Sequence, residues 1–346
     1  DLFAGVGGLS QGFIEAGFEI AFAIEYDKDI ASAYSLNHKG TDVYAEDIST
    51  IDIEQIKNKH PKIDIVMGGP PCQGYSQKGK RMSLDDPRNF MFQQFVKFVE
   101  VFEPKYFVLE NVPNIITTSD GFFKKQIIES FEKIGYKVTC GVLCATDFGV
   151  PQDRRRAVFI GQLDRLEIDL PKPNNKYTTI QDAIYDLPFI ASGEGFEIGE
   201  YDKQAISDFQ KKMRKGANVL CNHVATNHSK KALERLSMIP KGKGKEVLPE
   251  EHRTKSIYSG TWSRLLEEGV APTITTRFDT PSSGRFTHPI LDRCLTVREA
   301  ARIQTFPDTF IFSGSRTSQM KQVGNAVPPM LAFEIANVIA NNETKK

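Results

Sequence analysis

A cysteine preceded by two prolines is the residue of this sequence whose surroundings are best suited to chemistry. Pro70-Pro71-Cys72 follows the short apolar run 63–67 and precedes a basic loop, 76–88. An apolar run of this length is typical of a buried parallel strand, so we expect Cys72 at a strand's carboxyl end, where open α/β sheets bind ligands. Nearby lysines and arginines favour the thiolate, which is the reactive form. A lone cysteine is more often an inert core residue, but the prolines and the basic loop favour a nucleophile.

A carboxylate and two arginines are expected at the same edge of the sheet. Glu110 ends the apolar run 106–109, which reads as the neighbouring strand. In a shared pocket, burial favours the neutral carboxyl group, so Glu110 is predicted to act as an acid. Arg154 and Arg156 precede the strand predicted at 157–161. Alternation sends both to one side, where they could bind a carbonyl oxygen or Glu110.

The beginning of the chain reads as a strand, a glycine-rich turn and a helix over 9–16. This is the first βα unit of a doubly wound fold, and Gly5 and Gly7 would let a ligand lie against the backbone. The glycines do not have the spacing of the dinucleotide fingerprint, so no pyrophosphate is implied.

Acidic residues that end the next strands indicate a ligand with an adenosine part. Glu25 ends the strand predicted at 19–24, where an acid typically binds ribose hydroxyls, and Tyr26 could cover an adenine ring. The structural alternative is that Glu25 caps the helix predicted at 29–36. Asp47 follows another strand and could accept from the exocyclic amine of an adenine.

The composition limits the class of protein. The chain has 346 residues, of which 44 are basic and 44 acidic. This length allows a main domain and a second one, and zero net charge argues against a globally basic nucleic-acid binder. No apolar run approaches membrane-spanning length, and five cysteines without a disulfide framework favour a reducing cytoplasm. Cys140 and Cys144 lie in a predicted strand without a third ligand, so no metal site is predicted.

A change of composition indicates a second domain. From about Pro171 to about Asp292 the chain is richer in Gly, Ser, Thr and Lys. Three lysine-rich patches lie in this part, at 211–215, 230–231 and 241–245. Such runs are usually solvated faces, but their clustering favours a surface that contacts a partner.

Six short motifs, taken in order, resemble the cytosine-5 DNA methyltransferase family of the bacterial restriction-modification type. Any one motif is moderately specific, but six in the family's order are not plausibly chance. The region between about 190 and 290 is the variable part and gives no target sequence. The motifs are Asp-Leu-Phe-Ala-Gly-Val-Gly-Gly at 1–8, Pro-Pro-Cys-Gln at 70–73, Glu-Asn-Val at 110–112, Gln-x-Arg-x-Arg at 152–156, Arg-Glu-Ala-Ala-Arg at 298–302 and Gly-Asn-Ala-Val-Pro-Pro at 324–329.

The resemblance implies an α/β fold with a Rossmann-like, S-adenosylmethionine-dependent methyltransferase domain and a smaller target-recognition domain. The catalytic domain is expected at 1–188 and 316–346, and the recognition domain at 189–315. The implied partner is double-stranded DNA, with a cognate restriction endonuclease acting separately and no membrane. A monomer in the bacterial cytoplasm or nucleoid is expected.

The resemblance also implies a covalent mechanism. Cys72 would add to C6 of a cytosine flipped out of the duplex, because C5 alone is too weak a nucleophile to take a methyl group. Glu110 would hold N3 and the 4-amino group, and Arg156 would bind O2 with Arg154 close by. The basic loop would close over the base and contact DNA. The DNA contacts implied are Gln73, Ser76, Lys78, Arg81, Thr273 and Arg277.

S-adenosylmethionine is the implied cofactor and S-adenosylhomocysteine its product. Family members usually have Trp at the position of Tyr26, and the smaller ring should still stack. The implied cofactor contacts are Phe3, Gly5, Gly7, Glu25, Tyr26, Asp47, Ile48, Pro70 and Asn325.

Three alternatives stay open on the sequence. A transfer-RNA cytosine-5 methyltransferase of the same family would use the same residues, but the Cys-Phe-Thr tripeptide of that branch does not occur and the region 211–293 is long. A catalytically silent scaffold that binds cofactor or DNA would have lost Cys72 or Glu110, and both are present. A nicotinamide dehydrogenase would need the Gly-x-Gly-x-x-Gly turn that this chain lacks.

Overall fold

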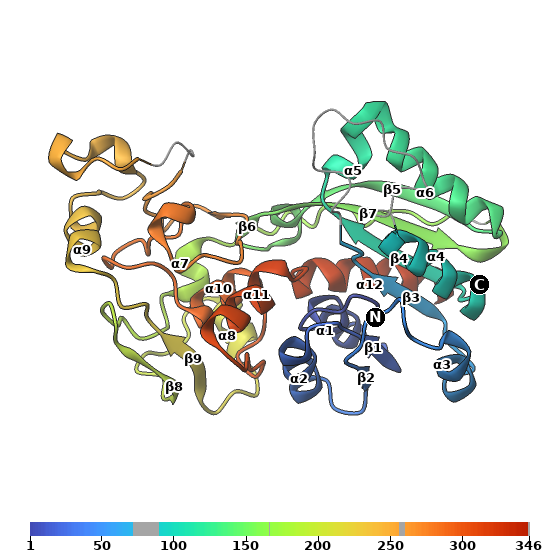
Figure 1. The fold of residues 1–346 in the computed structure, drawn as a ribbon. Coiled ribbons are helices and arrows are strands. Elements are labelled where there is room, and N and C mark those ends of the chain that lie inside the picture. The colour runs from blue at the N-terminus through green and yellow to red at the C-terminus, as the bar shows by residue number, and fades with distance from the viewer. Residues whose placement is uncertain (72–89, 166, 256–259, 345–346) are drawn as a thin grey trace. The chain divides into compact units, whose positions relative to one another are not determined.

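The computed structural model describes residues 1–71, 90–165, 167–255 and 260–344. Internal contacts divide the chain into two compact units (Figure 1). The first unit comprises Asp1–Cys144, Arg155–Pro173 and Pro329–Lys346, and the second comprises Ala145–Arg154 and Asn174–Pro328. The sequence predicted boundaries at 188/189 and 315/316. By contacts, residues 145–154, 174–188 and 316–328 belong to the second unit instead.

The first unit contains a twisted, mostly parallel sheet. Leu2 bridges Ile24 on one side and Gly68 on the other, which gives the strand order β2-β1-Leu2-β3-β4-β7-β5. The pairs β1–β2 and β3–β4 are parallel, whereas β7 is antiparallel to both β4 and β5. The strand order reverses at Leu2, as in a doubly wound fold, so the predicted α/β class is confirmed. The strands are β1 (Phe22–Ile24), β2 (Asp42–Tyr44), β3 (Ile65–Gly68), β4 (Tyr106–Asn111), β5 (Lys137–Cys144) and β7 (Arg155–Gln162).

Helices of the first unit bury one apolar face each. On α4, Phe95, Phe98 and Val99 recur at helical spacing and are fully buried. Gly12 lets α1 lie close to the last helix, since a Cβ there would be 2.4 Å from the Ala332 Cβ. The helices are α1 (Gly8–Glu15), α2 (Lys28–Asn37), α3 (Ile53–Lys59), α4 (Phe90–Phe102), α5 (Asn114–Thr117), α6 (Phe122–Lys133) and α12 (Pro329–Thr344).

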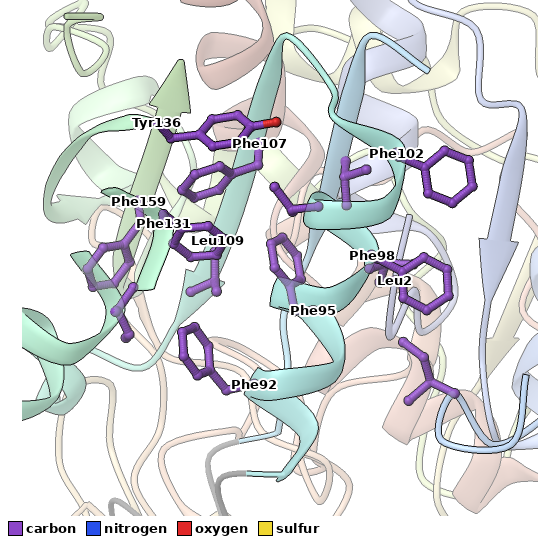
Figure 2. Packing of buried hydrophobic residues seen from close by; sticks show 14 of the residues in the cluster. Leu2, Phe92, Phe95, Phe98, Phe102, Phe107, Leu109, Phe131, Tyr136 and Phe159 are labelled. Carbon is purple, nitrogen blue, oxygen red and sulfur yellow. The ribbon is translucent and has the colours of Figure 1, made fainter. Parts of the chain in front are cut away.

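Aromatic rings fill the core between α4, α6 and the sheet (Figure 2). The rings of Phe107 and Phe131 stack with centroids 3.8 Å apart, and Phe95 meets Phe107 edge-on. Tyr136 packs against Phe107 and donates its hydroxyl to Pro104 O, so its polar end is satisfied. Each such ring stabilises the fold by about 1.5–3 kcal/mol on burial, which makes this cluster the rigid support for the strand ends of β3 and β4.

The second unit has little sheet and many short elements. Its strands form two pairs, parallel β6–β10 and antiparallel β8–β9. The strands are β6 (Gln152–Asp153), β8 (Gly195–Gly199), β9 (Leu220–Val224) and β10 (Ala271–Pro272), and the α-helices are α7 (Ile180–Ile184), α8 (Asp208–Arg214), α9 (Lys230–Ser237), α10 (Val297–Ile303) and α11 (Arg316–Asn325). Short 3-10 helices across the chain lie at Thr118–Gly121, Ala145–Phe148, Leu163–Arg165, Lys245–Val247, Glu250–His252 and Pro281–Ser283.

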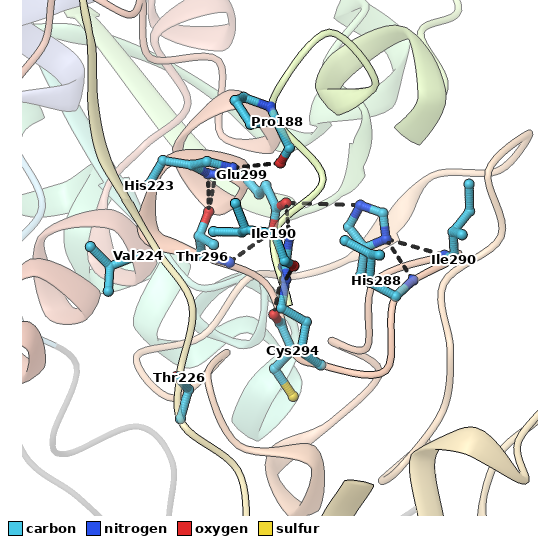
Figure 3. A network of polar contacts seen from close by, with 12 residues as sticks. Pro188, Ile190, His223, Val224, Thr226, His288, Ile290, Cys294, Thr296 and Glu299 are labelled. Carbon is cyan, nitrogen blue, oxygen red and sulfur yellow. Dashed lines mark hydrogen bonds and ion pairs between the residues drawn. The ribbon is translucent and has the colours of Figure 1, made fainter. Parts of the chain in front are cut away.

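Within the second unit, a network of buried polar contacts surrounds Glu299 (Figure 3). Glu299 forms a capping box with Thr296 and accepts two bonds from Arg293, both of 2.8 Å. Burial alone would raise the pKa of Glu299, but the Arg293 guanidinium holds that pKa well below its usual range. Helix α10 is buried on all sides, including Arg298 and Arg302. Their bonds to carbonyl oxygens and carboxylates make that burial possible.

By length and mean hydropathy alone, the described stretch Arg316–Thr344 could cross a membrane. However, 56% of its most apolar window is buried within the protein, as is usual for a core helix.

Candidate active site

The chain that leads to Cys72 is fixed next to Glu110. β3 and β4 are parallel neighbours, with Gly68 opposite Leu109, so the residues after each strand lie at one edge of the sheet. Asn111 donates its side-chain amide to Pro70 O at 2.9 Å. A Cβ on Gly69 would lie 2.9 Å from Glu110 Oε2, so glycine is needed for this approach. Five predicted site residues lie outside the described part of the chain: Cys72, Gln73, Ser76, Lys78 and Arg81.

Glu110 and Arg156 form an ion pair across β4 and β7. The strands are antiparallel with Glu110 opposite Val158, which places Arg156 on the same face of the sheet. Arg156 Nε lies 2.7 Å from Glu110 Oε1, and the two side chains are only 14% and 12% exposed. The contact between these two predicted site residues is therefore present. Breaking a pair this buried costs about 3–5 kcal/mol, so either partner holds the other in place.

Arg154 has a different environment. The two arginines, expected on one side of the chain before the strand, have different partners: Arg156 lies within β7 and pairs with Glu110, whereas Arg154 precedes β7. Arg154 is 1% exposed and donates to the carbonyl oxygens of Ile274 at 3.1 Å and Gly324 at 3.1 Å. A third bond goes to Asn325 O at 3.4 Å. The guanidinium of Arg154 is held by backbone carbonyls within the second unit and stabilises the fold there. It is not among the groups assigned to the reaction.

The turn after Leu2 forms an open cradle with Glu25. Gly5 has φ 55° and Gly7 φ 93°, both in the left-handed region that glycine tolerates. Glu25 Oε2 accepts from Gly5 N at 2.8 Å, and Glu25 Oε1 accepts from Asp27 N at 2.8 Å. A Cβ at Gly5 would meet no atom within 4 Å, so there is open space above the turn, whereas one at Gly7 would lie 2.2 Å from His38 Nε2.

Glu25 is available to a ligand because another acid caps the helix. The structural alternative for Glu25 is wrong: Asp27 is the N-cap of α2, accepting from Asp29 N and Ile30 N. Burial raises the pKa of the Glu25 carboxyl, while hydrogen bonds from Asp27 and Gly5 oppose that rise. Each carboxylate oxygen still has a lone pair for a hydroxyl donor.

The remaining groups expected around an adenosine surround the same strand ends. Tyr26 is 73% exposed, so one ring face is free for stacking, whereas Ile48 is buried. Asp47 accepts from Ser49 N at 2.9 Å, and this bond lowers the pKa of its carboxyl. Phe3 has φ 55° and packs at the edge of the core, which helps to shape the turn. A carboxylate, an exposed ring and an open glycine turn at the point of strand reversal fit a ribose and an adenine.

Besides Arg154, three predicted residues lie in the second unit. Thr273 donates its hydroxyl to Asp153 O at 2.8 Å. The Arg277 side chain is 62% exposed, with Nε 3.7 Å from Asp279 Oδ1. Asn325 is the last residue of α11 and is exposed. Among the residues the structure describes, no group of three His, Cys, Asp or Glu side chains could hold a metal ion.

Sequence reasoning did not assign roles to Gly69 and Asn111. Gly69 lies directly after β3 and immediately before the Pro-Pro-Cys-Gln motif, and Asn111 ends β4 inside the Glu-Asn-Val motif. A glycine between a strand and a double proline, and an asparagine directly after Glu110, are the signals of their positioning roles. Their roles can be inferred only when β3 and β4 are known to be neighbouring strands.

Comparisons with known proteins identify the family of this chain. The C-5 cytosine-specific DNA methylase family matches residues 1–341. The Type II methyltransferase M.DdeI of Desulfomicrobium norvegicum is 40% identical, with 98% of this chain and 88% of that protein covered. The Type II methyltransferase M1.HphI of Haemophilus parahaemolyticus is 38% identical, with 100% of this chain and 87% of that protein covered.

Solved structures share the fold. A crystal structure of a prophage-encoded DNA modification methyltransferase (E. coli) has a TM-score of 0.82 at 29% identity, covering 99% of this chain and 98% of that chain. The S. pombe Dnmt2 methyltransferase has a TM-score of 0.63 at 16% identity, covering 99% and 98%, which is a likeness of fold alone. The family match and the relatives together establish that this chain belongs to the C-5 cytosine-specific DNA methylase family, the enzymes that transfer a methyl group from S-adenosylmethionine to C5 of cytosine in DNA.

Proposed function

We propose that the chain is the modification methyltransferase of a restriction-modification system, with Cys72 as nucleophile, Glu110 as proton donor and Arg156 as ligand of the base oxygen. The single observation that carries this assignment is the 2.7 Å pair of Glu110 and Arg156. It lies beside Gly69 and Pro70, the residues that lead to Cys72. An acid, a cation and the approach to a thiol at one sheet edge are the parts that nucleophilic addition to a cytosine requires.

The chemistry assigns a step to each side chain. The Cys72 thiolate forms a bond to C6, the C5–C6 π electrons move to form a C4–C5 double bond, and the C4–N3 π electrons move onto N3. Glu110 gives a proton to N3 as negative charge develops there, and Arg156 donates to O2. C5 is now an enamine carbon and can take the methyl group that S-adenosylmethionine supplies. Loss of the C5 proton to a base then re-forms the C5–C6 double bond and expels Cys72 as a thiolate, and N3 returns its proton to the Glu110 carboxylate, which restores the neutral aromatic ring and the acid.

The ion pair sets a condition on the order of events. In the ligand-free protein Arg156 stabilises the ionised form of Glu110, and an ionised carboxylate cannot protonate N3. When Arg156 turns toward O2 of an entering base, that stabilisation weakens, and Glu110 can hold the proton it has to give. Binding of the base would therefore prepare the acid.

The cofactor groups have proposed roles that follow from their chemistry. Glu25 accepts from the ribose hydroxyls, Tyr26 and Ile48 cover the two faces of the adenine, and Asp47 accepts from its amine. The open turn at Gly5 leaves room for the methionine part. Phe3, Gly7, Pro70 and Asn325 complete the proposed contacts.

The part of the second unit at about 189–315 is the proposed recognition domain for duplex DNA. Thr273 and Arg277 are proposed DNA contacts, and so are Gln73 and, in the basic loop, Ser76, Lys78 and Arg81. If the lysines at 211–215 and 241–245 touch phosphate, the affinity for DNA falls steeply between low and moderate salt. An affinity that stays flat over this range would assign those lysines to solvent. A monomer in the bacterial cytoplasm, acting apart from a cognate endonuclease, completes the proposal.

Transfer of radiolabelled methyl from S-adenosylmethionine tests the function. Unmethylated genomic DNA and total transfer RNA are offered in parallel, and the DNA is then sequenced after bisulfite treatment. Label in DNA, with protected cytosines at one short motif, is expected. Label in RNA alone would support the transfer-RNA enzyme, and label in neither would support the silent scaffold.

Two variants test the assigned roles. Cys72→Ser is expected to bind S-adenosylhomocysteine and DNA normally but to lose turnover, because its hydroxyl is a far weaker nucleophile. Glu110→Gln is expected to slow the chemical step by about 100-fold or more, as is usual for loss of a general acid. A single-turnover rate equal to that of the wild type would remove either residue from the mechanism.

A further inference from the structure

A chain of side-chain amides in the second unit joins two segments that lie far apart in sequence. Gln152 accepts from Ile274 N at Oε1 and donates from Nε2 to Gln304 Oε1, both at 2.8 Å. Gln304 in turn donates from Nε2 to Val323 O at 2.7 Å and to Ala326 O at 3.3 Å. We call this chain of bonds, from Ile274 to Val323 and Ala326 through Gln152 and Gln304, the amide relay.

The two ends of the amide relay fix its direction. A backbone N–H can only donate and a backbone carbonyl can only accept, so each glutamine amide has one orientation that satisfies both its neighbours. Gln152 and Gln304 are both fully buried. A lost bond would therefore leave a polar group without a partner and away from water, which is the costly case.

Arg154 joins the same two segments a second time. It donates to Ile274 O on one side and to the carbonyl oxygens of Gly324 and Asn325 on the other. Ile274 is thus held at both its N–H and its C=O. The backbones are also in direct contact, because a Cβ on Gly324 would lie 2.4 Å from the carbonyl group of Thr275. Residues 273–275 and 323–326 consequently have one mutual arrangement.

We propose that Gln152 and Gln304 are positioning residues for both ligands of the enzyme. The inference rests on the proposed function, in which Thr273 contacts DNA and Asn325 contacts the cofactor. Neither glutamine is assigned to either ligand, so each acts through the segment that it holds. The amide relay fixes the register of the DNA-contacting segment against the cofactor-contacting turn, and one substitution in it disturbs both binding sites together.

The test measures two equilibrium affinities in the full chain. Gln304→Met keeps the size of the side chain but removes the donor to Val323 O and Ala326 O. We expect the affinity for S-adenosylhomocysteine, by calorimetry, and for duplex genomic DNA, by anisotropy, each to fall about tenfold, or 1.4 kcal/mol. Gln152→Met should lower both affinities by the same factor. The double variant should lower them little further, because the two residues share a hydrogen bond.

Gln210→Met is the matched control. Gln210 is also buried in the second unit, and it bonds Ile206 N, Ser207 N and Gln181 O, outside the amide relay. Its substitution should lower the melting temperature while both affinities stay unchanged. The proposal is overturned if Gln304→Met weakens the binding of neither ligand or of only one, or if Gln210→Met weakens the binding of both ligands as much as Gln304→Met does. Failure of the proposed function would appear separately, as wild-type protein that does not methylate DNA.

Discussion

Gly69→Ala is expected to slow catalysis without unfolding the protein. The new Cβ would lie 2.9 Å from Glu110 Oε2, whereas ordinary contacts begin near 3.4 Å, so the carboxylate has to retreat by roughly 0.5 Å. Because the same carboxylate is bonded to Arg156 at 2.7 Å, the retreat strains that pair. A misplacement of about 1 Å can cost about 100-fold in rate, so half of it predicts about a tenfold slower chemical step.

The assay is single-turnover methyl transfer at saturating cofactor and DNA, combined with a melting curve. Gly69 does not need a left-handed φ, so the backbone accepts alanine, and the melting temperature should stay near that of the wild type. Gly68→Ala is the contrasting variant, because its Cβ would lie 2.2 Å from the backbone oxygen of Leu2, which cannot move aside. Gly68→Ala should therefore lower the melting temperature.

A double-mutant cycle shows whether Gly69→Ala acts through Glu110. In a Glu110→Gln background the acid is already absent, so adding Gly69→Ala should cost much less than tenfold. An unchanged rate for Gly69→Ala alone, or an equal loss in both backgrounds, would refute the reasoning.

Three further predictions concern the cofactor, the second unit and pH. Tyr26→Ala should weaken the binding of S-adenosylhomocysteine about tenfold in calorimetry, because the stacking on the ring is lost, whereas Tyr26→Trp should keep the wild-type affinity. Equal affinities in the wild type and both variants would contradict this. Arg264 fills its five donors with four carbonyl oxygens and Asp292, so Arg264→Lys should lower the free energy of unfolding by about 3 kcal/mol, and a wild-type melting point would count against it. Burial lowers the pKa of His38 to about 4 and of His288 to about 3. Unfolding therefore takes up protons below pH 6.5, and urea midpoints should fall steadily from pH 7 to pH 4; a constant midpoint would refute it.

The first unit could be predicted closely from sequence because its signals are local. Helix α4, for example, has apolar residues that recur at helical spacing on one face, a signal that lies within the helix itself. The strand expected at 106–109 is β4, which extends two residues further to include Glu110 and Asn111. The turn after Leu2 followed from its glycines. Each of these assignments depends on residues within a few positions of one another.

What escaped prediction depends on partners far away in sequence. Arg298 and Arg302 read as the polar face of a helix, and only the surrounding carbonyls and carboxylates explain their burial. Arg154 looked like a partner of Arg156 until its three carbonyl acceptors were known. Gln304 gave no signal, because its bonding partners lie 152 residues before it and 19 and 22 after it.

The most direct test of the central claim is a covalent trap at Cys72. A duplex carries 5-fluorocytosine at the cytosine identified by bisulfite sequencing, so that C5 has no proton to lose and the thiolate cannot be expelled. With S-adenosylmethionine present, we expect a complex that survives denaturation, with the adduct at Cys72 by peptide mass spectrometry and absent from Cys72→Ser. Efficient methylation of the ordinary duplex without any such adduct, or with the adduct on another residue, would contradict the account.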